Sequence, residues 1–392
     1  MADENDDKMT LIKGVQPESE VAVEVVRKEI CDSLRVDNLN FLLGAGCSSL
    51  KRKNKSGDLE EIGIPAMVDL FNGFVNENPN FKIAHARPDV LKLCESNLEK
   101  LLEILEASAH LSDYLQLDSK SGKKIALIKH YLRQQITKGM NCVELLNLYK
   151  KFYERIAQQM RRTSPINIFT TNYDMLSERA LDELRFPYNN GFMGLSQRRF
   201  VPASFDYTFV ENMNLKRDSW EPVSSYFNLI KLHGSISWQK ENDELVEVQK
   251  IDETSDQQMM IYPSPLKDRS TLMTPYSDLF RVMENRLMRR NAVLIVIGYS
   301  FGDDHINRLI YNALASTSFR LIILNSSKTV KKLAQLNNPH ITVAYSKGEK
   351  KLHYFENFIE DLLPKPHPEA EESRLVLRKF GELLDANKKG EL

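Results

Sequence analysis

The strongest restriction on the fold of this chain is a repeated pattern in which a short apolar run ends in small polar residues and a helical periodicity follows. At 166–174 the sequence Ile-Asn-Ile-Phe passes into Thr-Thr-Asn-Tyr-Asp, and 175–184 then carries apolar side chains at the spacing of one helical face. A continuous apolar run at 292–297 is typical of a strand buried on both faces. Further strands are predicted at 39–43, 226–232, 321–324 and 341–344.

The repetition of strand, polar turn and helix predicts an α/β fold, with a Rossmann-like, doubly wound and mostly parallel sheet. Residues 91–162 show only helical patterns, so we expect a helical insertion subdomain there. The apolar stripe at 98–105 should pack within the chain, with a contact to a second subunit as the alternative. The predicted organisation is an N-terminal tail and helix at 1–37, a main domain at 38–346, and a C-terminal helix and polar tail at 347–392.

Within the N-terminal part, residues 1–17 are acidic and poor in core-forming side chains, so we expect them to be disordered or loosely docked. Residues 18–36 have apolar positions at helical spacing and are predicted to form an amphipathic helix. The acidic, polar segment 239–258 is predicted to be a hairpin or loop.

Charge and cysteine content argue against several classes of function. The net charge is −1, so there is no basic excess and direct nucleic-acid binding is not expected. No apolar run reaches membrane-spanning length and the first residues do not resemble a signal peptide, so we expect a cytoplasmic protein without a membrane partner. The 4 cysteines are far apart and form no Cys-x-x-Cys pair, so each is interpreted as a small buried hydrophobe and no metal site is predicted.

Polar clusters follow the predicted strands. Since parallel strands place their carboxyl ends on one edge of a sheet, these clusters should converge on one crevice, where open α/β sheets bind ligands. The clusters are centred on Gly44, Thr170, His233, Gly298 and Asn325.

Two of the clusters fit either ligand binding or local structure. The segment Gly44-Ala45-Gly46 would let the backbone approach a pyrophosphate, but Ser49 replaces the third glycine of the dinucleotide fingerprint and a plain tight turn is the alternative. The amide of Asn172 at a buried strand end needs hydrogen-bond partners, which a ribose or an ordered water would supply. Thr171 or Asp174 could simply cap the following helix.

The later clusters are equally open. His233 precedes Gly234 and could act as a general base or be a satisfied core histidine. The segment 298–300 and Asn325 could position a sugar or a diphosphate, or could merely shape loops. The polar residues at 303–307 are interpreted as a helix cap and a solvated face rather than a metal site.

Four motifs, taken in order, resemble the sirtuin-like NAD-binding domain, and the resemblance runs from about residue 38 to residue 346. The motifs are Gly44-Ala45-Gly46, Thr171-Asn172-Tyr173-Asp174, Leu232-His233-Gly234 and Gly298-Tyr299-Ser300-Phe301. The Thr-Asn-Tyr-Asp form and the segment 298–307 are similar to the NAD-hydrolysing branch of bacterial anti-phage defence. Protein-deacylating sirtuins carry a zinc ribbon, and the missing Cys-x-x-Cys pairs argue against deacetylation here.

The resemblance implies a NAD+ glycohydrolase that cleaves NAD to nicotinamide and ADP-ribose as an abortive-infection effector. It also implies a homo-oligomer whose activity is gated by assembly with a HerA-type hexameric ATPase or helicase. NAD is then the substrate, and no metal is needed. The alternatives are a module that binds or senses NAD or ADP-ribose without turnover, and a protein deacylase that lacks zinc.

By the same resemblance, Asn172 and His233 form the catalytic pair, and Asp174 assists by holding the carboxamide or the ribose. The residues expected to bind NAD are Gly44, Ala45, Gly46, Ser48, Thr171, Gly298, Ser300 and Asn325.

Overall fold

The computed structural model describes residues 8–365 apart from several interruptions. These are residues 17, 54–58, 80, 82–93, 95, 115–120, 159–163, 215–218, 224, 243, 252–257, 261–273, 328–329, 331–332, 334 and 349. The C-terminal tail predicted after residue 364 and most of the helix expected at 328–336 fall outside the described residues. In the described part, no helix is long and apolar enough to cross a membrane.

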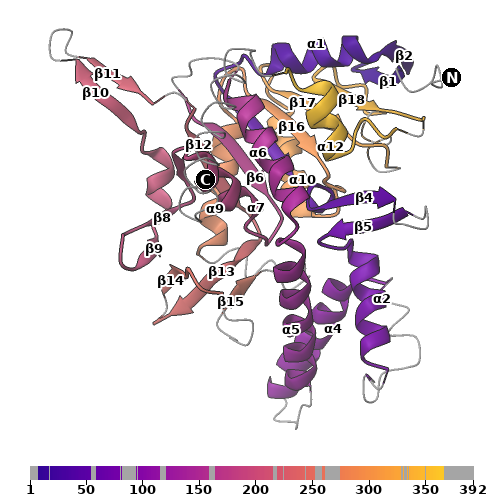
Figure 1. Ribbon diagram of the computed structural model, residues 1–392, viewed down its shortest axis with the longest axis vertical. Coiled ribbons are helices and arrows are strands. Elements are labelled where there is room, and N and C mark those ends of the chain that lie inside the picture. Colours follow the sequence, from indigo (N-terminus) through magenta and orange to yellow (C-terminus); the bar gives the residue numbers. More distant parts are fainter. Residues whose placement is uncertain are drawn as a thin grey trace, which may run out of the picture.

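The centre of the protein is a nine-stranded sheet with the order β2-β1-β18-β17-β16-β3-β6-β12-β7, and helices lie on both of its faces (Figure 1). The strands from β18 to β7 are mutually parallel. They are β3 (Leu39–Leu43), β6 (Ile166–Thr170), β7 (Tyr188–Asn189), β12 (Phe227–Lys231), β16 (Val293–Ile297), β17 (Arg320–Leu324) and β18 (Ile341–Tyr345). The predicted doubly wound α/β fold is therefore confirmed.

Strand order reverses between β3 and β16. After β3 the chain runs outward through β6 and β12, then returns to the other side of β3 and runs outward again through β16, β17 and β18. Loops that leave neighbouring strands in opposite directions open a crevice at their carboxyl ends, and ligands of open α/β sheets bind there. This reversal marks the expected place of a ligand site.

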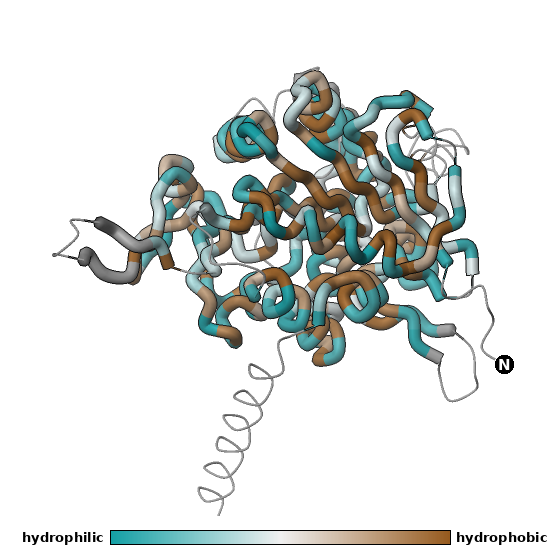
Figure 2. Tube along the Cα trace, turned by 90° about the horizontal axis from the view of Figure 1, so that it is seen from above, coloured by the Kyte–Doolittle hydropathy of each residue, from teal (hydrophilic) through white to brown (hydrophobic). Residues whose placement is uncertain are grey.

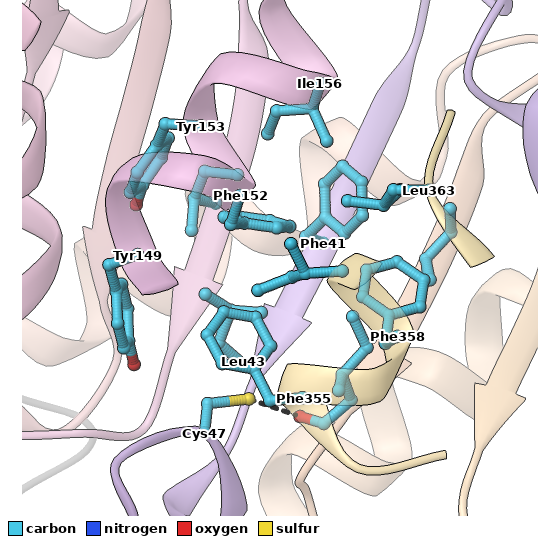
Figure 3. Packing of buried hydrophobic residues seen from close by; sticks show 14 of the residues in the cluster. Phe41, Leu43, Cys47, Tyr149, Phe152, Tyr153, Ile156, Phe355, Phe358 and Leu363 are labelled. Atoms are coloured by element: carbon cyan, nitrogen blue, oxygen red, sulfur yellow. Dashed lines mark hydrogen bonds between the residues drawn. The ribbon is translucent and has the colours of Figure 1, made fainter. Parts of the chain in front are cut away.

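Two apolar cores cover the two faces of the sheet, because successive side chains on a strand point to opposite faces. Phe41 and Leu43 of β3 pack on one face, and Leu42 packs on the other. Figure 3 shows Phe41 and Leu43 beside Phe152 and Phe355, and the rings of Phe41 and Phe152 meet edge to face at 5.2 Å. Figure 2 shows hydrophobic residues concentrated along the central strands.

Helices of both faces come from separate parts of the chain. The first core contains α1 (Val23–Ser33), α6 (Val143–Ala157), α7 (Leu176–Leu184), α12 (Phe355–Asn357) and the short π-helix η3 (Phe358–Leu362). The second contains α9 (Tyr276–Leu287) and α10 (Asp304–Ala313).

The N-terminal segment differs from the prediction. Residues expected to be disordered or loosely docked form β1 (Lys8–Lys13), which pairs antiparallel with β18, and β2 (Ser19–Ala22) pairs with β1. Met9 is buried in the first core, and Ile12 packs against the second. The prediction was wrong here because hydrogen bonding to the edge of β18 and these few apolar side chains outweigh the acidic composition. The expected helix at 18–36 is real but begins later, at Val23.

The helical insertion consists of α4 (Leu98–Tyr114), α5 (Ser121–Gly139) and α6. Helix α2 (Met67–Glu77) joins α4 and α5 in a third apolar core, and Figure 1 shows these helices extending away from the sheet. Leu98, Leu101, Leu102 and Leu105 are buried in that core, so the apolar stripe packs within the chain. The domain boundaries themselves stay a prediction.

A second, antiparallel sheet was not foreseen. It has the order β15-β13-β14-β9-β8, and the segment predicted as a hairpin or loop supplies β14 and part of β13. Its strands are β8 (Phe192–Met193), β9 (Arg198–Phe200), β13 (Gly234–Glu241), β14 (Glu244–Glu247) and β15 (Gln258–Met260). The remaining elements are the 3-10 helices η1 (Ala45–Cys47) and η2 (Pro202–Asp206) and the paired strands β4 (Ser49–Lys53) with β5 (Leu59–Gly63) and β10 (Val210–Asn214) with β11 (Ser219–Pro222).

Candidate active site

The polar clusters predicted from the sequence follow the carboxyl ends of β3, β6, β12, β16 and β17, and they are joined by hydrogen bonds. Asn172 Nδ2 donates to the carbonyl oxygen of Gly44 at 3.0 Å, which links β6 to β3. The Gly46 amide donates to the Gly298 carbonyl at 3.0 Å, which links β3 to β16. The structure therefore brings these clusters together where the strand order reverses.

The glycines after β3 serve close packing. A Cβ atom at Gly44 would lie 2.5 Å from the carbonyl oxygen of Gly298, and one at Gly46 would lie 2.9 Å from the Gly298 Cα. The amides of Gly44, Gly46, Cys47 and Ser48 all donate to backbone carbonyls. The tight-turn alternative accounts for this segment, and the exposed Ala45 is where a diphosphate could still meet the backbone.

Asn172 is nearly buried, with 8% of its surface exposed. Its Nδ2 also donates to Ser48 Oγ at 2.8 Å, and its backbone amide donates to Thr170 Oγ1 at 3.0 Å. Among the described residues, nothing donates to the Oδ1 atom. The protein itself thus fixes the amide, as a buried polar group requires, and leaves an oriented oxygen acceptor.

Both carboxylate oxygens of Asp174 accept hydrogen bonds from within the protein. Its Oδ2 accepts from Ser48 Oγ at 2.7 Å, and its Oδ1 accepts from the backbone amide of Leu176, the first residue of α7, at 3.0 Å. Burial raises the pKa of the Tyr149 hydroxyl on this network well above its usual value, and the Asp174 carboxylate adds to the effect. The helix-start alternative therefore explains Asp174, while Thr171 is half-buried and donates its amide to Leu43.

His233 is held by Asp303. The Nε2 atom lies 3.0 Å from Asp303 Oδ2, and both side chains are almost fully buried. Asp303 Oδ1 accepts from the amides of His305 and Ile306 at 2.9 and 3.2 Å, so the predicted helix cap is confirmed. Its second role as partner of His233 was missed, because 70 residues separate the two and no local spacing records the contact.

A buried ion pair lies next to the candidate site at this edge of the sheet. Lys231, the last residue of β12, donates to Glu178 Oε1 of α7 at 2.9 Å and also to the backbone carbonyl of Asp174. Burial raises the pKa of Glu178, although Lys231 opposes that shift. Sequence reasoning missed this pair, and the available signal was a lysine at the end of a strand that is predicted to be buried.

Of the remaining residues predicted to bind NAD, some make hydrogen bonds within the loops and one faces solvent. Asn325 Nδ2 donates to the Tyr299 carbonyl at 2.9 Å and its Oδ1 accepts from the Ser327 amide at 2.8 Å, which is loop structure. Ser300 is exposed beside the cluster, and Gly298 adopts a φ of 66°, which favours glycine. Ser300 is thus the predicted binding residue of this loop that faces solvent.

No group of three or more His, Cys, Asp and Glu side chains that could hold a metal occurs in the part of the chain that the structure describes. All four cysteines are free, and Cys47 and Cys94 are buried. Burial raises the pKa of the Cys47 thiol, which donates to the Ile297 carbonyl at 3.4 Å. Cys47 and Cys94 fit the expected role of small buried hydrophobes, whereas Cys31 and Cys142 are half-buried.

Comparison with known proteins finds a similarity over part of the chain. Residues 166–344 match the family described as the SIR2-like domain. Over this span the chain is similar to SIR2-like domains. The span includes Asn172, His233, Gly298 and Asn325.

A solved structure described as the structural basis for the mechanism and regulation of Sir2 enzymes is 12% identical, with a TM-score of 0.38. The alignment covers 86% of this chain and 96% of that one. Likeness at this level carries no part of the functional assignment. No curated protein matches the chain.

Proposed function

We propose that this protein is a NAD+ glycohydrolase that releases nicotinamide and ADP-ribose. The observation that carries the proposal is the buried His233–Asp303 pair at the edge that also holds Asn172, within the span similar to SIR2-like domains. The ring of Tyr173, the residue after Asn172, lies 6.3 Å from the ring of His233. The amide of Asn172 and the imidazole of His233 thus follow the ends of the neighbouring strands β6 and β12.

The reaction suits these residue types. Nicotinamide leaves NAD as a neutral molecule from a cationic precursor, so no acid has to protonate it, unlike the leaving group of ordinary glycosides. The protein must orient the attacking water or ribose hydroxyl and accept one proton. Asn172 Oδ1 would orient the nucleophile, while Ala45 and Ser300 are exposed where they could contact the diphosphate or the ribose.

We infer from the His233–Asp303 contact which ring nitrogen of His233 would act in the reaction. A hydrogen bond from Nε2 to the Asp303 carboxylate would keep the ring proton on Nε2, and Nδ1 would then be the atom that accepts a proton. Asp303 is then a positioning residue, because it fixes the imidazole ring and its tautomer without touching the substrate.

The test is release of nicotinamide and ADP-ribose from NAD, measured by chromatography. We expect His233→Ala and Asn172→Ala to lose about 10²-fold or more in kcat. Asp303→Asn keeps a good helix cap but changes the partner of Nε2, so we expect a loss of about 10²-fold and an altered pH profile. Asp304→Asn, at the exposed neighbouring position, is the matched control and should keep full activity. Full activity in both His233→Ala and Asn172→Ala would sink the assignment.

We further propose that the enzyme is an abortive-infection effector in anti-phage defence. The forms of the segments 171–174 and 298–307 support this, together with the toxicity of unrestrained NAD cleavage to the cell. We expect a homo-oligomer that is gated by assembly with a HerA-type hexameric ATPase. Co-purification and NAD consumption should require both proteins. Equal NAD consumption by the isolated chain and by the assembly would contradict gating.

One observation favours a second candidate, a module that senses NAD or ADP-ribose. Asp174 and the backbone amides after β3 already make hydrogen bonds within the protein. These bonds fix the shape of the site before a ligand arrives, which suits binding as well as catalysis. NAD binding in calorimetry with no product, even in the assembled complex, would support sensing. Release of acetyl-ADP-ribose from an acetylated peptide would instead revive a deacylase without zinc.

A further inference from the structure

A pocket of about 510 Å³ lies at the amino edge of the central sheet, opposite the candidate active site. Its walls are the segments that precede β3, β16, β17 and β18 together with the first residue of β17, and they contribute Arg35, Arg290, Arg320 and His340. The strands β3 and β16 are five residues long. At about 3.3 Å per residue they separate the two edges by about 17 Å.

The side chains of the three pocket arginines make no polar contact within the part of the chain that the structure describes. Within the described ranges, neither Arg35 nor Arg290 nor Arg320 makes an ion pair or a side-chain hydrogen bond. By contrast, Arg155 and Arg198 pair with Glu360 and Glu247 at 2.7 and 2.6 Å. The arginines that line the pocket therefore keep their full donor capacity.

The charge of the pocket contrasts with that of the whole chain. Asp37 is the only acidic residue in its lining, so the side chains carry a net charge of +2 when His340 is neutral. The chain as a whole carries −1. Three guanidinium groups around one cavity repel one another, and a bound anion removes that repulsion.

We propose that this pocket binds a small anion with two or more phosphate groups. Planar guanidinium groups bind phosphate oxygens in pairs, and the hydroxyls of Thr317 and Ser318 supply neutral donors in the same lining. The volume suits a small molecule. The lining has no Phe, Tyr or Trp on which a nucleic-acid base could stack, so the recognised part is the phosphate chain rather than a base.

The pocket is separate from the candidate NAD site and does not depend on the proposed function. Ligands of open parallel sheets bind at the carboxyl ends of the strands, whereas this pocket lies at their amino ends. It nevertheless touches the start of β3 and β16, whose far ends carry Gly44 and Gly298. Pyrophosphate binding is therefore measured without NAD and without any activity readout.

The test is calorimetric titration of the full chain with inorganic pyrophosphate and triphosphate. We expect the double variant Arg290→Gln/Arg320→Gln to weaken binding roughly tenfold or more for each guanidinium removed. The control Arg185→Gln/Arg308→Gln removes the same charge at exposed positions elsewhere and should bind normally. Binding should weaken as salt rises. Asp37→Asn removes the one opposing carboxylate and should tighten binding about two- to threefold.

Three outcomes overturn the proposal. They are no binding of either probe at millimolar concentration, equal binding by the pocket and control double variants, and no gain in Asp37→Asn. A single-stranded oligonucleotide is the competing probe. If it binds more tightly than triphosphate and the pocket variant abolishes that binding, the site belongs to nucleic acid and the small-anion proposal fails.

Discussion

At the carboxyl edge of the central sheet Lys231 is buried and held 2.9 Å from Glu178, whereas at the amino edge Arg290 and Arg320 pair with no described residue. Lys231 is buried at the end of β12, whereas Arg290 is exposed before β16 and Arg320 is half-buried at the start of β17. At the first edge the protein satisfies the charge itself, so the charge belongs to the fold. At the second edge the charge is left for something outside the chain. The two edges should therefore respond differently to the same kind of substitution.

The largest expected difference is in stability. Lys231→Met leaves the buried Glu178 carboxylate without its cation and should lower the free energy of unfolding by about 3–5 kcal/mol. Arg290→Met at the amino edge breaks no pair and should change it by less than about 0.5 kcal/mol. Urea unfolding of both variants measures the comparison.

A double variant provides the control for the carboxyl edge. Lys231→Met together with Glu178→Leu removes both charges and should recover much of the loss, because an apolar pair can replace a buried ion pair. If Arg290→Met proves as destabilising as Lys231→Met, the amino-edge arginines serve the fold and the contrast between the edges is false.

A smaller effect should appear on acidification. His353 Nδ1 accepts from the Ser346 amide at 3.3 Å and its Nε2 lies 3.2 Å from Ser326 Oγ, just past the carboxyl ends of β18 and β17. Burial lowers the pKa of His353 to about 4, and Lys351 adds to the effect. The unfolded chain takes up this proton first, so stability is full above about pH 6.5 and is lost as pH falls toward 4. The expected loss from pH 7.5 to pH 5 is about 2 kcal/mol.

His353→Gln tests that origin, because glutamine can donate and accept hydrogen bonds but does not titrate. The difference in unfolding free energy between the two pH values should shrink by about 2 kcal/mol in the variant. An equal fall in both proteins would show that the acid sensitivity arises from other groups.

The strands and the polar turns at the carboxyl edge could be predicted because each is visible as a pattern among residues that are close in the sequence. The run at 292–297 and the turn after Thr170 both carry their pattern locally. The hydrogen bonds that hold the turns of this edge together join residues that are far apart in the sequence, so no local pattern predicts them. Ser48 and Asp174 are 126 residues apart, and His233 and Asp303 are 70 apart.

The same limit explains the other differences. Strand β1 forms because β18 offers an unpaired edge, which the acidic composition of the N-terminus does not reveal. The pocket arginines lie at three separate places in the chain, before β3, before β16 and at the start of β17, and only the return of the chain to β3 brings Arg35 beside Arg290 and Arg320. The roles of Asn172 and His233 in NAD chemistry stay predictions.

A further effect at the carboxyl edge concerns Ser48, which donates to Asp174 and accepts from Asn172. Ser48→Ala leaves one buried acceptor and one buried donor unsatisfied and should cost about 1–3 kcal/mol of stability. Ser300→Ala, at an exposed position of the same edge, should cost less than about 0.5 kcal/mol. Because Ser48 also orients Asn172, NAD cleavage should fall in Ser48→Ala even at temperatures where the variant is fully folded. Unchanged stability and activity in Ser48→Ala would mean that the side chain of Asn172 is oriented by Gly44 alone. Among the polar groups at the carboxyl edge, only the Lys231–Glu178 pair would then remain as a candidate stabilising contact of the comparison.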